Sequence, residues 1–199
     1  MKNPQAFILV DTETHEHLSL DVPDRIRPEW ALVNTATEKL KTGRAARKQW
    51  SLEIFDRLQQ KKFSMLNSLR DLEHRDLENA LHTLPRKMRP GLRYLVTENR
   101  RVQRMVVAIR KRDWQLMGAL LKMSHASRRD DWMITSPIED FVVEEAERFS
   151  LEGVYGATQT GEGSFILVAG QPLTLPAFLD HLRRSWPAQA SKTPETFIL

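Results

Sequence analysis

Side chains that could carry out hydrolysis gather between residues 124 and 131. Ser124, His125 and Ser127 stand together and are followed by the acidic pair Asp130 and Asp131. In nucleophilic catalysis an imidazole takes the proton of a serine hydroxyl while a carboxylate orients the imidazole. The segment lacks the G-x-S-x-G turn that exposes a nucleophilic serine. The sequence therefore favours a structural interpretation, in which these short polar side chains cap helix ends and hydrogen-bond locally.

The segment Thr160-Gly161-Glu162-Gly163 is a second candidate, because glycine loops let backbone N–H groups approach a phosphate closely. Glu162 interrupts the glycines and adds a negative charge where phosphate oxygens would lie, so we expect weak binding of nucleotide phosphates. The chain contains neither the G-x-x-x-x-G-K-[ST] pattern of a phosphate loop nor a G-x-G-x-x-G fingerprint. A tight hairpin turn is the alternative interpretation of these residues.

A metal site has little support in the sequence. His15 and His17 could place two imidazoles on one face of a strand, but no third ligand has a suitable spacing, which favours a solvated turn. The chain has no cysteine, so neither a disulfide framework nor a zinc–thiolate site is available. We expect no metal site.

The composition is typical of a globular protein, with 199 residues, 41% of them hydrophobic and 28% charged. The early apolar run of residues 6–10 is too short for the core of a signal peptide. No stretch approaches the roughly 20 apolar residues of a membrane span. We therefore expect a cytoplasmic protein that makes no contact with a membrane.

The formal net charge of +4 is concentrated between residues 86 and 112. At about 100° per residue, Arg93, Arg100, Arg104 and Lys111 fall on one stripe of a helix. A nucleic acid or an acidic protein could bind such a stripe. The stripe carries no aromatic side chain on which a base could stack, so nucleic-acid binding is disfavoured against a protein partner or a plain solvated face.

Hydrophobic periodicity predicts the elements that must position these residues. Residues 6–10 and 17–20 are expected to form an antiparallel pair of strands, with 30–33 as a third. Helices are expected at about 44–62, 72–81, 90–109, from Asp113 onward, and 137–149. Strands at 154–160 and 164–169 form a hairpin, a helix spans 175–186, and an edge strand covers 193–199. The prediction is one α+β domain over 1–199: strands to residue 35, mainly helices over 36–150, and a hairpin, helix and edge strand over 151–199.

Several runs in a fixed order resemble the C-terminal half of a galactokinase, a member of the GHMP small-molecule kinase superfamily. They are residues 95–99 with Arg101 and Val102; Ser124, His125, Ser127, Arg129, Asp130, Asp131, Pro137 and Asp140; and Gly156, Thr160, Gly161 and Gly163. The resemblance implies a ferredoxin-like α+β lobe, in which an antiparallel sheet accompanies a large helical portion. It also implies that residues 124–140 are structural, and that Thr160, Gly161 and Gly163 lie near bound phosphates.

The resemblance implies that the catalytic parts of such a kinase lie elsewhere. The family's phosphate loop, sugar-binding carboxylate and arginine belong to its N-terminal half, upstream of the residues that match here. The family's tyrosine beside the sugar also has no counterpart, and Glu162 replaces a glycine. We therefore expect no catalytic residue and no kinase turnover in the isolated chain, with ATP and Mg²⁺ bound only when an N-terminal half is present.

Three hypotheses of function remain open. The chain is one half of a split sugar kinase, a degenerate relative that binds a sugar, nucleotide or protein without catalysis, or a basic interaction module that uses the helix from Arg93 to Lys111. The first predicts an exposed apolar surface on the sheet where the N-terminal half docks. The second predicts that this surface is polar or closes as a homodimer, and the third predicts binding that weakens steeply with salt.

Overall fold

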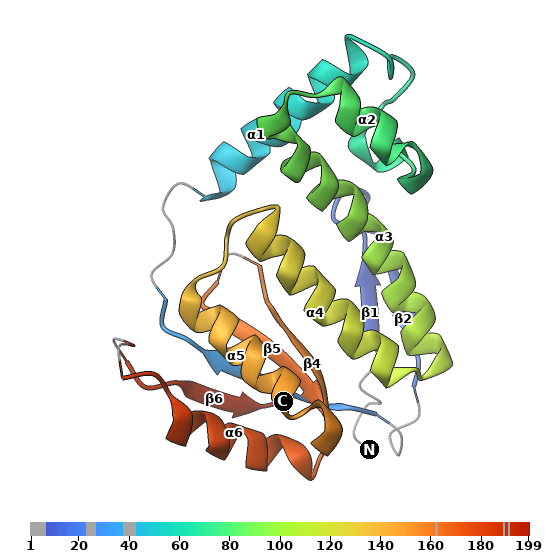
Figure 1. Cartoon of the computed structure of the whole chain (residues 1–199). Coiled ribbons are helices and arrows are strands. Elements are labelled where there is room, and N and C mark those ends of the chain that lie inside the picture. Colours follow the sequence, from blue (N-terminus) through green and yellow to red (C-terminus); the bar gives the residue numbers. More distant parts are fainter. Residues whose placement is uncertain (1–6, 23–26, 38–42, 162, 189, 191) are drawn as a thin grey trace.

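The computed structural model describes residues 7–22, 27–37, 43–161, 163–188, 190 and 192–199. Four strands form an antiparallel sheet in the order β4-β5-β3-β6 (Figure 1). These strands are β3 (Glu29–Asn34), β4 (Val154–Gln159), β5 (Phe165–Gly170) and β6 (Glu195–Ile198). Helix α5 (Pro137–Arg148) precedes β4, and α6 (Thr174–Ser185) connects β5 to β6. Two split β-α-β units thus interleave, which is the ferredoxin-like arrangement expected from the sequence.

The sheet buries one face under α5 and α6. Side chains alternate between the faces of a strand, so Ala31 and Val33 point into this core together with Ile166 and Val168. Phe178 of α6 is fully buried among them. This core is close-packed, so deletion of a large side chain from it would leave a cavity. The packing therefore fixes how α5 and α6 lie on the sheet.

A helical portion is inserted between β3 and α5. It consists of α1 (Gly43–Gln59), α2 (Leu77–Thr83), α3 (Arg89–Lys111) and α4 (Trp114–Asp130). The first three enclose a core of their own, in which Ile54, Leu58 and Leu92 are fully buried. An aromatic stack joins α1 and α3 to the segment that follows α4. Trp132 of that segment stacks on Trp50 of α1 and on Tyr94 of α3, with ring centroids 5.2 and 4.6 Å away.

Helices α3 and α4 run antiparallel through a tight turn. Arg112 takes a left-handed conformation with φ of 58°, and the Asp113 carboxylate then accepts a hydrogen bond from the Leu116 backbone N–H at 2.9 Å. Asp113 therefore caps α4, as predicted. Gly118 of α4 then lies against the backbone of β4 at Tyr155 and Gly156.

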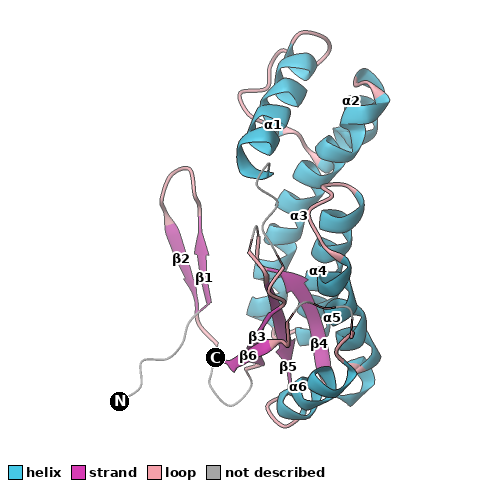
Figure 2. Ribbon diagram, turned by 90° about the vertical axis from the view of Figure 1, so that its left-hand side faces the viewer, coloured by secondary structure: helices cyan, strands magenta, loops and turns pink. Residues whose placement is uncertain are grey.

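The strands β1 (Phe7–Val10) and β2 (His17–Leu20) form a separate two-stranded hairpin beside α3 and α4 (Figure 2). Phe7 anchors it through contacts with Trp30 and Trp114, at ring-centroid distances of 5.8 and 6.3 Å. The expectation that residues 30–33 are a third strand of this pair was wrong. Residues 30–33 belong to β3, whose two sides are already paired with β5 and β6.

The predicted helix at 72–81 was also wrong in its start. Two short 3-10 turns, Leu69–Asp71 and His74–Asp76, precede α2, which begins only at Leu77. The Asp71 carboxylate accepts hydrogen bonds from the backbone N–H groups of Asn67 and Ser68, both at 2.9 Å, and so favours a turn over a helix.

The other predicted elements are confirmed, with ends within a few residues of those expected. Expectations for Ala6 and Glu162 fall outside the described residues. That the 199 residues fold as a single domain stays a prediction. Within the described part of the chain, no helix combines the length and apolar composition that crossing a membrane requires.

The contact of α4 with β4 can be tested by Gly118→Ala. In an exposed helix this change stabilises by about 1 kcal/mol. Here the new Cβ would lie 1.9 Å from the carbonyl oxygen of Tyr155, so helix and strand must separate. We expect the free energy of unfolding in urea to fall by about 1–3 kcal/mol. Gln115→Ala, on the exposed side of α4, is the control and should change it by less than about 0.5 kcal/mol. Equal or greater stability of Gly118→Ala would contradict the contact.

Candidate functional site

The candidate site is the loop between β4 and β5 and the two segments that hold its base. Thr160 donates from its backbone N–H and its hydroxyl to the carbonyl of Phe165, at 3.0 and 3.1 Å, and so closes the hairpin. The Ser164 carbonyl accepts from the backbone N–H and the hydroxyl of Thr35, both at 2.8 Å. The loop is thereby fixed to the end of β3.

The first glycine of the loop has a backbone conformation that favours glycine. Gly161 has φ of 102°, in the region that side-chain-bearing residues rarely adopt, and a Cβ placed there would meet no atom within 4 Å. A Cβ on Gly163 would be in ordinary van der Waals contact, with its nearest neighbour, a ring carbon of Phe165, at 3.8 Å. Steric crowding therefore does not explain these two glycines. Their positions remain free for an anion or a neighbouring surface to approach the backbone.

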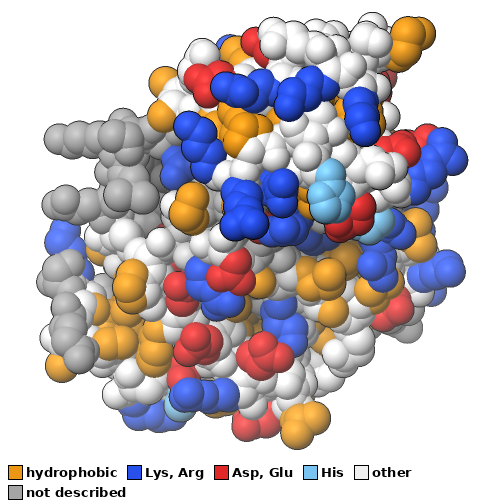
Figure 3. Space-filling view, turned by 45° about the horizontal axis from the view of Figure 1, so that its top comes forward, with side chains coloured by type: hydrophobic (Ala, Val, Ile, Leu, Met, Phe, Trp, Pro, Cys, Tyr) orange, Lys and Arg blue, Asp and Glu red, His pale blue; other side chains and the backbone are white. Residues whose placement is uncertain are grey.

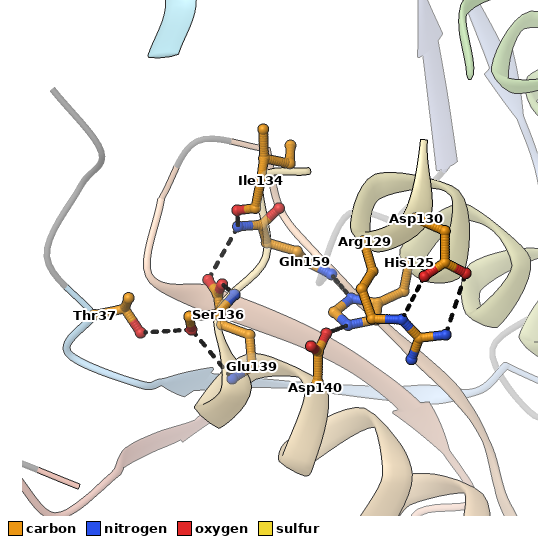
Figure 4. Close-up of polar contacts among 9 residues, drawn as sticks. All are labelled: Thr37, His125, Arg129, Asp130, Ile134, Ser136, Glu139, Asp140 and Gln159. Atoms are coloured by element: carbon orange, nitrogen blue, oxygen red, sulfur yellow. Dashed lines mark hydrogen bonds and ion pairs between the residues drawn. The ribbon is translucent and has the colours of Figure 1, made fainter. Parts of the chain in front are cut away.

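The N-terminus of α5 is fixed beside the loop (Figure 4). Ser136 caps the helix by accepting from the Glu139 backbone N–H, and the Glu139 carboxylate accepts from the Ser136 backbone N–H at 2.8 Å. This reciprocal pair is a capping box. The Thr37 and Ser136 hydroxyls are 3.3 Å apart, which connects the end of β3 to the start of α5. Pro137 opens the helix, as predicted.

Beneath the loop, Gln159 and Glu139 form a buried polar layer. The Gln159 side-chain N–H group donates to Glu139 at 3.0 Å and to the Ile134 carbonyl at 3.2 Å. Burial raises the pKa of the Glu139 carboxyl, while its hydrogen bonds to Gln159 and Ser136 oppose that rise. The layer contacts α5, β4 and the segment after α4 at once, so it sets the position from which the loop departs.

His125 continues this layer and is held in one tautomer. Its Nδ1 accepts a hydrogen bond from the Gln159 backbone N–H at 3.3 Å, so the proton of the neutral ring lies on Nε2. Nε2 donates to the Asp140 carboxylate at 2.9 Å. Burial lowers the pKa of His125, although the Asp140 carboxylate opposes this. Both ring nitrogens are therefore occupied by structural partners, which leaves the imidazole no free position for proton transfer.

The serines beside His125 face other partners. The Ser124 hydroxyl donates to Glu98 of α3 at 2.6 Å, and the Ser127 hydroxyl donates to Asp131 at 3.0 Å. Asp131 also accepts from Arg93 of α3 at 2.9 Å. Neither serine is bonded to the imidazole among these contacts, so the residue types of a hydrolytic triad are present without its geometry.

Arg129 and Asp130 stand apart from this network. They form an exposed pair with each other, with Nε and Oδ1 2.8 Å apart. The pairing with Asp130 raises the pKa of Arg129, and the same pairing lowers the pKa of Asp130. Of the residues predicted as structural, Ser124, His125, Asp131 and Asp140 thus connect different elements, whereas this pair does not. The structural role predicted for the residues between 124 and 140 stays a prediction. So does the phosphate-side role of Thr160, Gly161 and Gly163.

Sequence reasoning missed Ser136, Glu139 and Gln159. The pattern Ser136-Pro137-x-Glu139 was a visible signal, because a serine followed three residues later by glutamate marks a capping box. Gln159 had no such signal, since a single glutamine in a strand does not reveal which face it takes.

The described residues at this loop supply only some of the groups that would bind nucleotide and magnesium. The loop offers open backbone positions at Gly161 and Gly163 for phosphate oxygens. Among the residues that the structure describes, no group of three or more His, Cys, Asp or Glu side chains is placed to hold a metal ion. The described carboxylates at the base of the loop are already hydrogen-bonded within the protein.

Removal of His125 should destabilise the fold. His125→Ala leaves the buried Gln159 N–H and the Asp140 carboxylate without a partner, so we expect a loss on the order of 2–4 kcal/mol in the free energy of unfolding. Asp130→Ala breaks only an exposed pair and should cost less than about 1 kcal/mol. Equal losses in the two variants, measured by urea denaturation, would show that the His125 contacts do not support the fold.

The protonation of His125 gives a second test. Its folded pKa lies below the ordinary value of 6.5, so between these two values the unfolded chain binds a proton that the native protein does not. This contribution to stability is present above pH 6.5 and is lost as the pH falls below it. An NMR titration of the imidazole should place the pKa of His125 below 6.5. A value at or above 6.5 would contradict the buried neutral ring.

Comparison with solved structures supports the fold. The galactokinase of Lactococcus lactis, solved in complex with galactose, superimposes with a TM-score of 0.86 over 97% of this chain and 50% of that one, at 22% identity. The mevalonate kinase of L. major, in complex with R-mevalonate, gives 0.57 over 96% of this chain and 48% of that one, at 15% identity. The described chain therefore shares the fold of about half of each of these two kinases.

Sequence comparison also finds galactokinases, although no family model matches the chain. The galactokinase of Roseiflexus sp. is 39% identical over 98 residues, which are 49% of this chain and 25% of that enzyme. The galactokinase of Streptomyces coelicolor is 33% identical over 136 residues, 66% of this chain and 34% of that enzyme. The chain spans about a quarter to a third of the curated relatives it matches. In sequence and in fold, it is similar to the C-terminal part of the galactokinases, which are GHMP kinases.

Proposed function

We propose that this chain supplies the C-terminal lobe of an ATP-dependent sugar kinase and is inactive without an N-terminal lobe. The observation that carries the proposal is the match to the C-terminal part of galactokinases, over a fold that covers half of one of them. Phosphoryl transfer depends on positioning and on charge stabilisation by a phosphate loop, cations and a carboxylate. We assign those groups to the N-terminal lobe, on the same polypeptide or on another. Galactose is the first substrate to test.

The open face of the sheet supports the presence of a second lobe. Leu32 is paired with Leu167 on one side and Phe197 on the other, and all three point away from the core under α5 and α6. Leu32 and Leu167 are half-buried, and Phe197 is 49% exposed. An apolar row of this kind is typical of a surface that a partner covers. It fits the apolar docking surface that the kinase hypothesis predicts better than the polar face expected of a stand-alone relative.

In this proposal the β4–β5 loop forms the phosphate-side wall of the site. Ligands would approach the open backbone at Gly161 and Gly163, with Thr160 closing the hairpin behind them. The charge of Glu162, whose placement lies outside the described residues, would oppose phosphate oxygens and so weaken the binding of nucleotide. The supporting network of His125, Asp140 and Gln159 holds the loop in place and takes no part in proton transfer.

The alternative of a basic interaction module is weaker. Arg93, one of the four residues of the stripe, is paired with Asp131 of α4 at 2.9 Å. On the face drawn in Figure 3, basic side chains are interspersed with acidic and hydrophobic ones, most clearly in its lower half. Such mixing reduces the long-range potential that steers a polyanion. Arg100, Arg104 and Lys111 remain exposed, so a salt-dependent partner is still a secondary candidate.

The test is purification of the native protein from its own cells, followed by mass determination and an assay of sugar phosphorylation from ATP. We expect an N-terminal lobe with a glycine- and serine-rich phosphate loop, either in the same polypeptide or bound in equal amount, and phosphorylation of galactose or another sugar. The 199 residues expressed alone should give no turnover. Turnover by these residues alone, or a native protein that lacks the second lobe and phosphorylates no sugar, would overturn the proposal.

A matched pair of variants tests the docking surface. Phe197→Ser removes an aromatic ring from the open sheet face, whereas Leu173→Ser removes a side chain that is 92% exposed before α6. If the second lobe covers the sheet, Phe197→Ser should lower kcat/KM for the sugar at least about tenfold, and Leu173→Ser should leave it within about twofold. Equal effects of the two changes would place the second lobe elsewhere.

A further inference from the structure

A cavity of about 280 Å³ lies between the β1–β2 hairpin and the helix pair α3–α4, on the side of α4 away from α5. Most of its wall is apolar. Phe7 and Leu20 come from the hairpin, Val106 and Ile109 from α3, and Leu120 and Leu121 from α4. Ligand sites are typically concave, mainly apolar, and supplied with a few polar groups in fixed positions. The volume suits a small molecule rather than a protein segment.

The polar residues of the cavity gather at one end. Glu98 and Arg101 of α3 lie level with Ser124 and Arg128 of α4, because the two helices run antiparallel and Ser124 is bonded to Glu98. Thr158 of β4 faces the same space. The apolar residues lie farther along both helices, toward the turn that joins them. The cavity is therefore amphipathic along its length.

The charges at the polar end do not balance. The Glu98 carboxylate accepts from Arg101 at 2.7 Å and lies 3.8 Å from the nearest nitrogen of Arg128. Two guanidinium groups thus share one carboxylate, which leaves a net charge of one positive unit. The side chains of Arg101 and Arg128 are only 11% and 16% exposed. Buried charge is costly unless it is paired, so this end favours an added anion.

Three buried polar atoms at this end have no hydrogen-bond partner among the described residues. They are one terminal nitrogen of Arg101, Nε of Arg128 and the hydroxyl oxygen of Thr158. A buried donor that is left unpaired destabilises the folded protein. All three atoms belong to residues that line the same cavity. None of them takes part in the hydrogen bonds of the polar layer at His125 and Gln159.

We propose that this cavity binds a small amphipathic carboxylate, with its apolar body between hairpin and helices and its carboxylate against Arg101, Arg128 and Thr158. A guanidinium matches the planar geometry of a carboxylate. One unpaired positive charge beside Glu98 suits a monoanion and disfavours a phosphate dianion. The site is separate from the β4–β5 loop, and binding there does not depend on the proposed kinase function.

The experiment is calorimetric titration of the whole protein with sodium octanoate, kept below the concentration at which octanoate forms micelles. We expect one octanoate per chain. The uncharged 1-octanol has the same apolar body and should bind at least about tenfold more weakly, because it offers no charge to the guanidinium groups. Absence of octanoate binding, or equal binding of octanoate and 1-octanol, would overturn the proposal.

Three variants locate the site. Arg128→Gln should weaken octanoate binding about tenfold, whereas Arg100→Gln, an exposed arginine of α3 outside the cavity wall, should change it less than about twofold. Thr158→Val keeps the shape of the side chain and removes the hydroxyl, and should weaken binding about threefold or more. Equal effects of the two arginine changes would overturn the site. If Arg128→Gln does not fold, as judged by circular dichroism, an unchanged affinity of Thr158→Val would overturn it.

Discussion

The contact between the backbones of α4 and β4 is the constraint on which the rest of the structure depends. Gly118 and Gly156 face each other so closely that a Cβ on either would lie within 2.3 Å of a carbonyl oxygen. Only at this separation do the later residues of α4 lie beside the end of β4. The Gln159 N–H can then reach the His125 ring. The same approach places Thr158 at the wall of the cavity next to α3.

One strand therefore serves two polar regions of opposite character. Thr158 and Gln159 are neighbours in β4, and their side chains point to opposite faces. On the Gln159 side the imidazole and the side-chain N–H group of Gln159 are hydrogen-bonded within the protein, and the side-chain oxygen of Gln159 alone has no partner among the described residues there. On the Thr158 side two guanidinium groups share one carboxylate and several donors are unused. The first arrangement is what a rigid support requires, and the second is what a site for an anionic ligand requires.

Sequence reasoning recovered most of the fold, because strong local signals accompany most elements. The two glycines between residues 159 and 165 marked the hairpin, Asp113 marked the start of α4, and Pro137 marked the start of α5. It failed where the pairing of distant segments decides the outcome. Residues 30–33 read as a strand, but nothing local shows that their partners are β5 and β6 rather than the hairpin that precedes them.

The sequence predicted the types of residue near the candidate site, but it did not predict which residues contact one another there. The group Ser124, His125 and Asp131 was found at once, yet the sequence did not show that Ser124 and Asp131 bond to α3 while His125 bonds to α5. The cavity beside α3 was not foreseen at all. Its polar end needs Glu98, Arg101, Arg128 and Thr158, which come from three elements and meet only in the folded chain.

The aromatic stack of Trp50, Trp132 and Tyr94 bears on how the helical portion can be observed. Its rings come from α1, from the segment after α4 and from α3, and they lie nearly parallel at 20° and 13°. Rings held in such fixed, asymmetric surroundings give a near-ultraviolet circular dichroism signal that disappears when tertiary packing is lost. The chain therefore carries a built-in optical reporter of whether α1 remains docked, separate from the far-ultraviolet signal of the helices themselves.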